Sequence, residues 1–497
     1  MRDKYDIVII GSGFGGLMCG AFLSKHGFKV VLLEMGKVAG GNLQSFVKNG
    51  AVFNTGLHYV GAMEKGQILN KIFNYLGVLD RVEFDRLDPD CYDRIIIGDR
   101  EYASASGFEN YAARLISYFP GEETAIRNYV EKIRAVWNSN PFINLRDIDK
   151  DKDNVSPFST EGLVDVINSL TDNEELKAVL LANNGLYAGM PERTPFYVHA
   201  LINCVFIQSA FTVKGGSYRL ADALVSIIRE QGGEVLTGKK VVKIRCEELN
   251  AVAAVTEDGE EFCADNFYSS IHPAEAVKLF EEGVFRKPFI RRLTEMPNTI
   301  GSFILYIKFK KKSFRHFASS IYFSTNTDVW GAKYRLEEWP KSVMMYTSPD
   351  EDSAWAQSAT VITFMHYDEV AHWEDKQRRN SDPAYEAFKS DRSERVFEML
   401  EKRFHGIRDA SESWFSSTPL TYRDYTGSPE GSMYGIAKDY KSEVGPYMPV
   451  RTRISNFIMT GQSIGVHGIM GVAMNSIIAS SVLIDVNQLI REIREAN

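Results

Sequence analysis

A glycine-rich segment near the beginning of the chain limits the possible folds more than any other feature. The run Gly11-Ser12-Gly13-Phe14-Gly15-Gly16 lies between the apolar stretch 7–10 and a helical pattern of apolar residues, and the next apolar stretch ends at Glu34. A buried strand, a glycine turn, a helix and a second strand with a terminal acid form the unit that binds the ADP part of a dinucleotide. The glycines let the backbone approach a pyrophosphate at the helix N-terminus, and the acid accepts hydrogen bonds from a ribose. We therefore predict an α/β fold with a Rossmann-type domain.

The residues after Glu34 indicate which dinucleotide is bound. The pair Gly40-Gly41 is followed by Asn42-Leu43-Gln44-Ser45-Phe46 and then by the stretch 52–59. An NAD-binding domain usually continues directly into another helix and strand. A second glycine pair followed by Ser or Thr and an aromatic residue is typical of FAD enzymes, which hold a longer cofactor. The sequence therefore predicts FAD.

Segments far along the chain complete this domain. After a helical pattern that begins near residue 218, the stretch 241–244 is expected to form a strand whose Val241 backbone lies against the adenine. Near the end, a short apolar strand leads to Gly461, and a helix begins at Gly468. The partial positive charge of a helix N-terminus suits the negative region of a reduced flavin. We predict a discontinuous FAD-binding domain of residues 1–75, 205–285 and 450–497. The residues predicted to contact FAD are Gly11, Ser12, Gly13, Phe14, Gly15, Gly16, Glu34, Met35, Gly40, Gly41, Asn42, Gln44, Ser45, Gly56, Leu57, Val241, Gly461, Gln462, Gly468, Ile469, Met470 and Gly471.

The segments between these pieces have a different character. Residues 105–205 are mainly helical in pattern, whereas residues 290–450 contain stretches of alternating apolar and polar residues that predict antiparallel strands, at 302–310, 319–324, 343–346 and 360–367. We predict that both segments form one inserted α+β substrate domain, an antiparallel sheet capped by helices.

Composition excludes several classes of protein. The chain has 497 residues and a formal net charge of −8, and it has no basic stripe, which argues against nucleic acid as a partner. The five cysteines are scattered without a CxxC pair, which suits a reducing compartment. The first strand follows Met1 closely, so we expect no signal peptide, and Gly and Ser interrupt the apolar stretch 465–486, so we expect a buried helix there and no membrane span. These features predict a cytoplasmic protein, with peripheral membrane contact left open.

A resemblance to a known family rests on longer motifs. The block 53–64, with Thr55-Gly56-Leu57-His58-Tyr59 at its centre, resembles a block of retinol saturases, and the motifs at 418–421, 429–431, 434–435 and 460–462 are similar to theirs in type and order. The chain thus resembles the retinol saturase branch of the phytoene desaturase and carotenoid isomerase superfamily of FAD-dependent oxidoreductases. The resemblance runs from the first strand to the last helix and is weakest at 105–205 and 310–400. Asn54 and the segment 463–467 depart from the family pattern, and Gln462 stands where many flavoproteins have Asp.

The resemblance implies chemistry on C=C bonds of a hydrophobic polyene or isoprenoid, retinoid-like or carotenoid-like, with saturation favoured. Flavin supplies the hydride chemistry that side chains lack. Desaturation, cis/trans isomerisation and an amine oxidase-like activity remain open, as does a non-enzymatic role as a prenyl- or lipid-binding escort, although escorts typically lose the glycines that are present here. The electron source also stays open among transient NAD(P)H, a ferredoxin-like partner and a quinone, because no second GxGxxG occurs downstream.

Two histidines are candidate proton donors. His58 follows Gly56 by two residues, in the segment expected to pass the flavin ring, and an ordinary imidazole titrates near neutral pH. His467 directly precedes the helix expected to face the flavin. Each has a structural alternative, since His58 could only shape the pocket and His467 could only pack. The histidines at 366 and 372 lack the spacing of a metal-binding helix, and we expect no metal.

Overall fold

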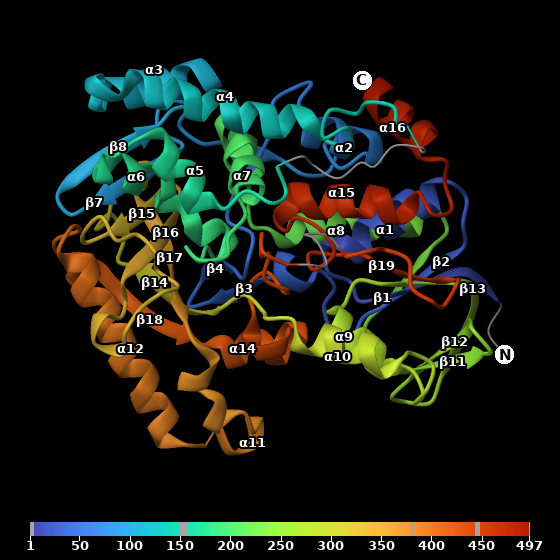
Figure 1. Ribbon diagram of the computed structural model, residues 1–497. Helices are drawn as coiled ribbons and strands as arrows, with labels where there is room; N and C mark the ends of the chain where they lie inside the picture. The colour runs from blue at the N-terminus through green and yellow to red at the C-terminus, as the bar shows by residue number, and fades with distance from the viewer. Residues whose placement is uncertain (1–3, 150–157, 380, 443–447, 497) are drawn as a thin grey trace.

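The computed structural model describes residues 4–149, 158–379, 381–442 and 448–496. Two large sheets lie side by side in this part of the chain, with a layer of helices along one edge of the molecule (Figure 1). One sheet is built around the glycine-rich segment, and the other comes from the insertions. The functional site is formed where they meet.

The first sheet has the strand order β10-β2-β1-β13-β12-β11, and β19 also pairs with β13. Its central strands are parallel, and β2 between β1 and β10 is wholly apolar and buried, whereas β11 and β12 pair in antiparallel fashion. Three separate stretches of chain supply the strands: β1 (Tyr5–Ile10), β2 (Val30–Leu33), β10 (Glu234–Leu236), β11 (Val241–Glu247), β12 (Asn250–Thr256), β13 (Glu261–Ser269) and β19 (Phe457–Met459).

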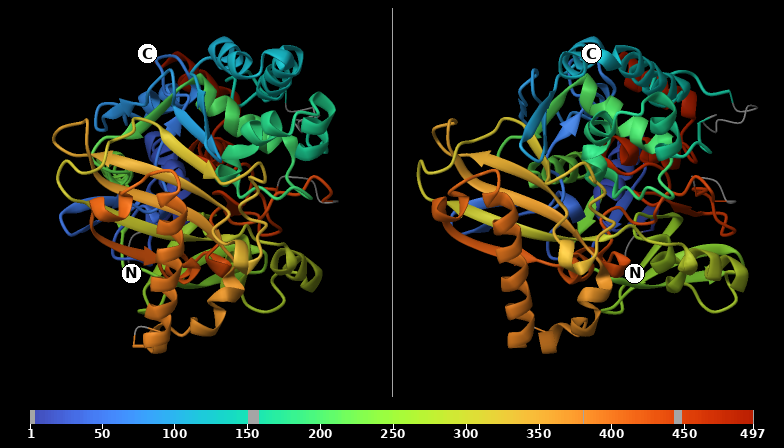
Figure 2. Two further views of the ribbon diagram at one scale, coloured as in Figure 1. Left: turned by 90° about the vertical axis from the view of Figure 1, so that its left-hand side faces the viewer. Right: turned by 60° about the vertical axis from the view of Figure 1, so that its left-hand side comes forward.

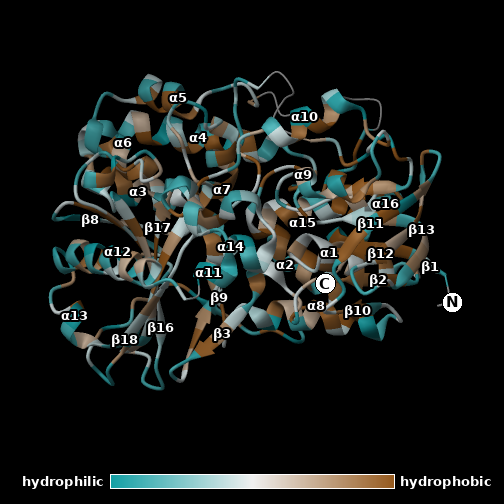
Figure 3. Cartoon of the chain, turned by 90° about the horizontal axis from the view of Figure 1, so that it is seen from below, coloured by the Kyte–Doolittle hydropathy of each residue, from teal (hydrophilic) through white to brown (hydrophobic). Residues whose placement is uncertain are grey.

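Helix α1 is the centre of packing on this sheet, in contact with both α8 and α15. Apolar residues predominate in α1 and β1 (Figure 3). The helices of this half are α1 (Phe14–Lys25), α2 (Ile68–Leu76), α8 (Tyr218–Glu230), α9 (Pro273–Ala276), α10 (Lys287–Glu295), α15 (Gly468–Ser480) and α16 (Val486–Glu495). Within the described ranges, no helix has both the length and the apolar composition needed to cross a membrane.

The second sheet has the order β18-β14-β17-β16-β15-β7-β8 and is antiparallel except where β15 meets β7. Its strands are β7 (Asp93–Ile97), β8 (Arg100–Ser104), β14 (Gly301–Phe309), β15 (Ser320–Ser324), β16 (Ser342–Pro349), β17 (Ala356–Met365) and β18 (Ser411–Ser417). The predicted domain bounds include β7 and β8 in neither domain. These strands form a local hairpin, and the partner that joins the hairpin to the second sheet, β15, lies more than 200 residues away from β7. The predicted α/β fold with an inserted antiparallel sheet is confirmed.

Side chains alternate between the faces of this second sheet. Phe303 and Leu305 of β14 pack beneath α12, which lies along the outer side of the sheet in Figure 2. Ile304 and Tyr306 point to the opposite face, toward the short β3–β4 hairpin. The connecting elements are β3 (Ser45–Lys48), β4 (Ala51–Asn54), β5 (Val60–Gly61), β6 (Phe84–Arg86), β9 (Ala210–Val213), α11 (Lys376–Arg379), α12 (Pro383–Glu401), α13 (Ile407–Ala410) and α14 (Pro419–Thr426).

The helical layer covers the region where the sheets meet. It consists of α3 (Phe108–Tyr118), α4 (Glu123–Ser139), α5 (Leu163–Leu170), α6 (Glu174–Leu181), the 3-10 helix η3 (Ala182–Tyr187) and α7 (Phe196–Gln208). Helix α7 is buried along nearly its whole length and contacts α4, α5 and η3. It forms one wall of the site described below.

Replacement of Gly16 tests the close contact of α1 with its own strand. A Cβ at Gly16 would clash with the carbonyl oxygen of Gly11, a backbone atom that cannot move without shifting β1. We expect Gly16→Ala to lower the free energy of unfolding by about 1–3 kcal/mol. Gly121→Ala is the control, since a Cβ there would have no described atom within 4 Å, and it should change stability by less than about 0.5 kcal/mol. Equal unfolding curves for both variants would contradict this account of the glycine.

Candidate functional site

The N-terminus of α1 is open toward a ligand. Gly13 is its N-cap, and among the described residues no side chain caps the helix. A Cβ built on Gly13 would have no described atom within 4 Å, so free space lies in front of the first N–H groups. Uncapped N–H groups and the helix dipole together favour an anion at this position. The geometry fits the pyrophosphate of a dinucleotide.

Glu34 ties the glycine-rich segment to the end of β2. Its side chain is 7% exposed. One carboxylate oxygen, Oε2, accepts hydrogen bonds from the Ser12 N–H at 2.9 Å and from the Ser12 hydroxyl, and Oε1 accepts one from the Gly36 N–H at 2.6 Å. A carboxylate has about four acceptor positions, so one remains for a ribose hydroxyl. Val241 begins the strand just beyond Lys239, whose N–H donates to the Glu34 carbonyl at 2.7 Å.

The second glycine pair lies directly against the first loop. The Gly40 N–H donates to the Ser12 carbonyl at 3.1 Å, and a Cβ on Gly41 would lie 3.1 Å from the Gly13 Cα. The neighbouring Asn42 has a buried Oδ1 without a hydrogen-bond partner in the described structure. A buried amide oxygen usually has a partner, so Asn42 is suited to meet a polar group of a ligand.

Other predicted contact residues are partly occupied by the protein itself. The Ser45 hydroxyl donates to Asn54 Oδ1 at 2.8 Å and lies 3.2 Å from the Ser217 hydroxyl, at the start of α8. The Gln44 side-chain amide donates to the Val38 carbonyl at 2.9 Å. Met35 is largely exposed, and Leu57 is buried.

The C-terminal segment comes back to the same place. A Cβ on Gly15 would lie 2.9 Å from the Gly461 Cα, so α1 touches the backbone after β19. Helix α15 begins at Gly468, which has φ of 73°. A Cβ built on Gly468 would meet no atom of the described residues within 4 Å. As in α1, no described side chain caps this helix. Helices α1 and α15, each with an open N-terminus, also pack against each other.

His58 lies against the inner face of the second sheet. Its ring stacks on Tyr346 of β16, with the centroids 4.3 Å apart and the planes at 6°. Its Nε2 is buried and has no hydrogen-bond partner in the part of the chain described. Burial lowers the pKa of His58 to about 4, so the imidazole is neutral at pH 7. Burial therefore moves the pKa of His58 below the near-neutral value of an ordinary imidazole, and its role as a proton donor stays a prediction.

His467 is buried in the same region, as the N-cap residue of α15. It is 4% exposed, and its ring lies 4.3 Å from that of Tyr434. Its Nδ1 has no hydrogen-bond partner among the residues described. Burial, helped by the positive charge of Lys438, lowers the pKa of His467 to about 4. This side chain too is a neutral imidazole at pH 7.

A cluster of tyrosines around Asp93 supports the His58 side of the site. The hydroxyls of Tyr59 and Tyr322 lie 2.6 Å apart, and Tyr322 also forms a side-chain hydrogen bond with Tyr346. Asp93, 1% exposed at the start of β7, lies within this cluster. Burial raises the pKa of Asp93 well above its ordinary value, which favours the protonated carboxyl. No sequence pattern marked Asp93 or Tyr346, because strand pairing alone brings them to His58.

His467 lines a polar cavity and an apolar cavity. The polar cavity, about 270 Å³, also has Arg193, Val198, His366, Asp368, Glu430 and Lys438 in its wall. The apolar cavity, about 240 Å³, is lined chiefly by Phe142, Ile143, Leu201, Ile202, Val205, Val466, Met470 and Met474. Ile469, between Val466 and Met470, is half-buried.

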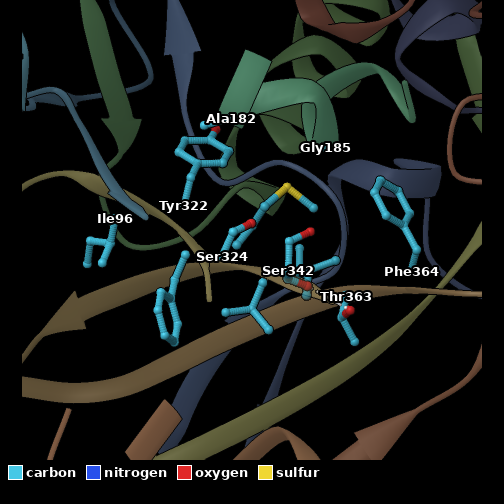
Figure 4. A pocket seen from close by; sticks show the side chains of 12 residues that line it. Ile96, Ala182, Gly185, Tyr322, Ser324, Ser342, Thr363 and Phe364 are labelled. Atoms are coloured by element: carbon cyan, nitrogen blue, oxygen red, sulfur yellow. Dashed lines mark hydrogen bonds between the residues drawn. The ribbon is translucent and has the colours of Figure 1, made fainter. Parts of the chain in front are cut away.

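A smaller cavity lies between η3 and strands β15 to β17. Figure 4 shows Tyr322, Gly185 and Phe364 around it. Its volume of about 10 Å³ suffices for about one water molecule. It is therefore too small for a substrate.

The histidines near residue 370 have ordinary packing partners. The His366 ring lies 4.7 Å from that of Tyr334, and the His372 ring lies 3.7 Å from that of Trp373. Over the described ranges, no group of three or more His, Cys, Asp or Glu side chains is arranged to hold a metal ion.

Known proteins resemble the chain in sequence and in fold. Residues 14–408 match the family described as flavin containing amine oxidoreductase. The chain is 27% identical to an all-trans-retinol 13,14-reductase of Danio rerio, over 98% of this chain and 87% of that protein. It is 27% identical to a 4,4'-diapophytoene desaturase of a Methylomonas species, over 63% and 62% of the two chains. An oxidoreductase from Methanosarcina mazei has the same fold, with a TM-score of 0.67 at 17% identity over 95% and 99% of the chains.

Substitution of Gly13 separates cofactor binding from folding. Because a Cβ at Gly13 enters open space in the described structure, we expect Gly13→Ala to fold with near wild-type stability. The same methyl group would occupy the place predicted for the pyrophosphate, so the purified variant should retain less than about a tenth of the wild-type flavin, a loss of about 1.4 kcal/mol or more in affinity. The ratio of flavin absorbance to protein concentration measures the flavin retained. Thermal unfolding of the wild-type and variant apoproteins measures stability. Full flavin occupancy would show that the pyrophosphate lies elsewhere.

Asp93 makes stability depend on pH. Its pKa is raised in the folded protein, so above about pH 4 the unfolded chain loses a proton that the folded chain keeps, and stability falls as pH rises toward the folded pKa. We expect Asp93→Asn to gain stability relative to wild type, by an amount that grows between pH 4 and pH 7 in urea unfolding. Asp99→Asn, in the exposed turn after β7, controls for the loss of one formal charge. A stability difference that does not change with pH would refute the raised pKa of Asp93.

Proposed function

The chain belongs to the family of flavin-containing amine oxidoreductases, and on this premise we propose that it is an FAD-dependent enzyme that saturates a C=C bond of a hydrophobic polyene or isoprenoid. The observation that carries the proposal is the position of His467. It is the N-cap residue of α15, whose N-terminus is open and where a flavin is expected, and it also lines the apolar cavity. A hydrophobic substrate in that cavity would lie beside the cofactor.

The relatives support the choice of substrate. One is named as a reductase of all-trans-retinol and another as a desaturase of 4,4'-diapophytoene, so both act on C=C bonds of long unsaturated chains. The apolar cavity has leucine, isoleucine, valine, methionine and phenylalanine side chains in its wall. Such a lining suits a hydrocarbon chain better than a small charged amine.

The residues predicted to contact FAD have separate tasks in this proposal. The N-terminus of α1 with Gly13 holds the pyrophosphate, Glu34 accepts from the ribose, and the N-terminus of α15 faces the ring system. A bound flavin supplies hydride transfer. His467 touches the substrate from the wall of the cavity, and its unpartnered Nδ1 can accept or donate one hydrogen bond there.

His58 has a supporting role at neutral pH. As a neutral imidazole held flat against Tyr346, it shapes the wall of the site and can donate its one N–H. An anionic group placed beside it would raise its pKa again, because opposite charges favour the protonated form. His58 therefore becomes a better proton donor only when negative charge is near.

Electrons come from outside the chain in this proposal. Transient NAD(P)H, a ferredoxin-like protein and a quinone remain the candidate donors. All five cysteines are free in the described structure, which fits a reducing compartment such as the cytoplasm, and contact with a membrane surface would give access to a lipid-soluble substrate.

Anaerobic reduction of the purified holoenzyme followed by addition of retinoids and carotenoids tests the proposal. We expect a polyene to reoxidise the flavin and to gain two hydrogens, measured by absorbance and by product mass. His467→Gln should slow reoxidation at least tenfold, whereas His372→Gln, at an exposed position, should not. A loss of two hydrogens with the oxidised enzyme would indicate desaturation, and an unchanged mass with altered geometry would indicate isomerisation. If no polyene reacts, the proposal fails.

A further inference from the structure

Both cavities at His467 follow the same side of α7. Val198 lies in the wall of the polar cavity, and Leu201, Ile202 and Val205 lie in the wall of the apolar cavity. These positions are spaced at i, i+3, i+4 and i+7, so they share one face of the helix over a length of about 10 Å. The cavities are thus consecutive along α7, with His467 at the junction.

The volumes favour one ligand that occupies both cavities. At about 270 and 240 Å³, each is smaller than the roughly 300–1,000 Å³ typical of sites for drug-sized ligands, whereas together they lie within that range. One ligand in both would need an apolar part and a polar end. A pure hydrocarbon would leave polar groups of the first cavity without partners.

The charges in the polar cavity favour an anionic end group. Lys438 donates to the Ser463 carbonyl at 2.8 Å, which leaves two of its three N–H groups. Neither Lys438 nor Arg193 forms an ion pair with a carboxylate in the described residues. The acids of this cavity, Asp368 and Glu430, are exposed at its rim, whereas Lys438 and Arg193 are half-buried and His467 is buried.

We propose that the substrate is a polyene with a carboxylate at one end, and that Lys438 and Arg193 bind this carboxylate in the polar cavity while the chain lies along α7 in the apolar cavity. This inference rests on the proposed function and specifies its substrate class. The reacting double bond then lies near His467, between the polar end and the rest of the chain.

The state of Lys438 agrees with this role. Burial lowers the pKa of Lys438 to about 7, so without an anion the ammonium is costly to keep charged. A bound carboxylate offsets that cost, and charge-assisted hydrogen bonds are stronger than neutral ones.

Binding of three polyenes of equal length, ending in a carboxylate, an alcohol and a methyl group, tests the proposal. The oxidised holoenzyme is titrated with each, and binding is measured by quenching of tryptophan fluorescence. We expect the carboxylate to bind most tightly. Lys438→Met should weaken its binding about tenfold or more and change binding of the methyl-ended polyene less than twofold. Arg193→Gln should act in the same direction.

Lys441→Met is the matched control, since Lys441 is three residues away, exposed and outside the cavity wall. It should leave all three affinities unchanged. If Lys438→Met weakens all three ligands equally, or if the alcohol and the carboxylate bind alike to wild type, the carboxylate site is refuted while the proposed function stands. If none of the polyenes binds or reoxidises the reduced enzyme, the proposed function itself fails.

Discussion

Close backbone contact between glycines is the constraint on which the rest of this structure depends. Gly16 lies against the Gly11 carbonyl, Gly15 against Gly461, and Gly41 against Gly13. Because a side chain at any of these positions would push two segments apart, the absence of Cβ atoms lets loops separated by hundreds of residues meet at one helix N-terminus. The proposed cofactor site is a consequence of that meeting.

The second sheet determines what faces this meeting point. Since side chains alternate along β16, Val343 and Met345 enter the core under α12, whereas Met344 and Tyr346 turn toward the first domain. A shift of one residue in register would replace Tyr346 by an aliphatic or hydroxyl side chain against His58. The register of β16 with β17 is therefore part of the site, although β16 is not itself near any cofactor motif in sequence.

Local patterns allowed much of this architecture to be predicted. The glycine run with Glu34 indicated the parallel sheet, and alternation of apolar and polar residues indicated β14 to β17, close to their actual bounds. The pairing of β7 with β15 could not be predicted, because it depends on contacts between distant segments and β7 is an ordinary apolar stretch. For the same reason Asp93, Tyr346 and Lys438 went unrecognised, since each is a single residue without a motif and acquires its role only from its neighbours in space.

Burial also separates the behaviour of these titratable groups from what residue type alone suggests. The same desolvation that makes His58 and His467 neutral raises the pKa of Asp93 and lowers the pKa of Lys438 to about 7. All four groups respond in the direction that removes charge from the interior. A site of this kind suits an uncharged hydrocarbon chain along most of its length, and it can become charged only where a ligand brings a charge of its own. Lys438 and Arg193 are at the half-buried end of the polar cavity, where such a charge would enter, while the acids at the rim remain in contact with water. The distribution of burial, more than the identity of any single residue, therefore separates the part of the site that holds a chain from the part that recognises its end.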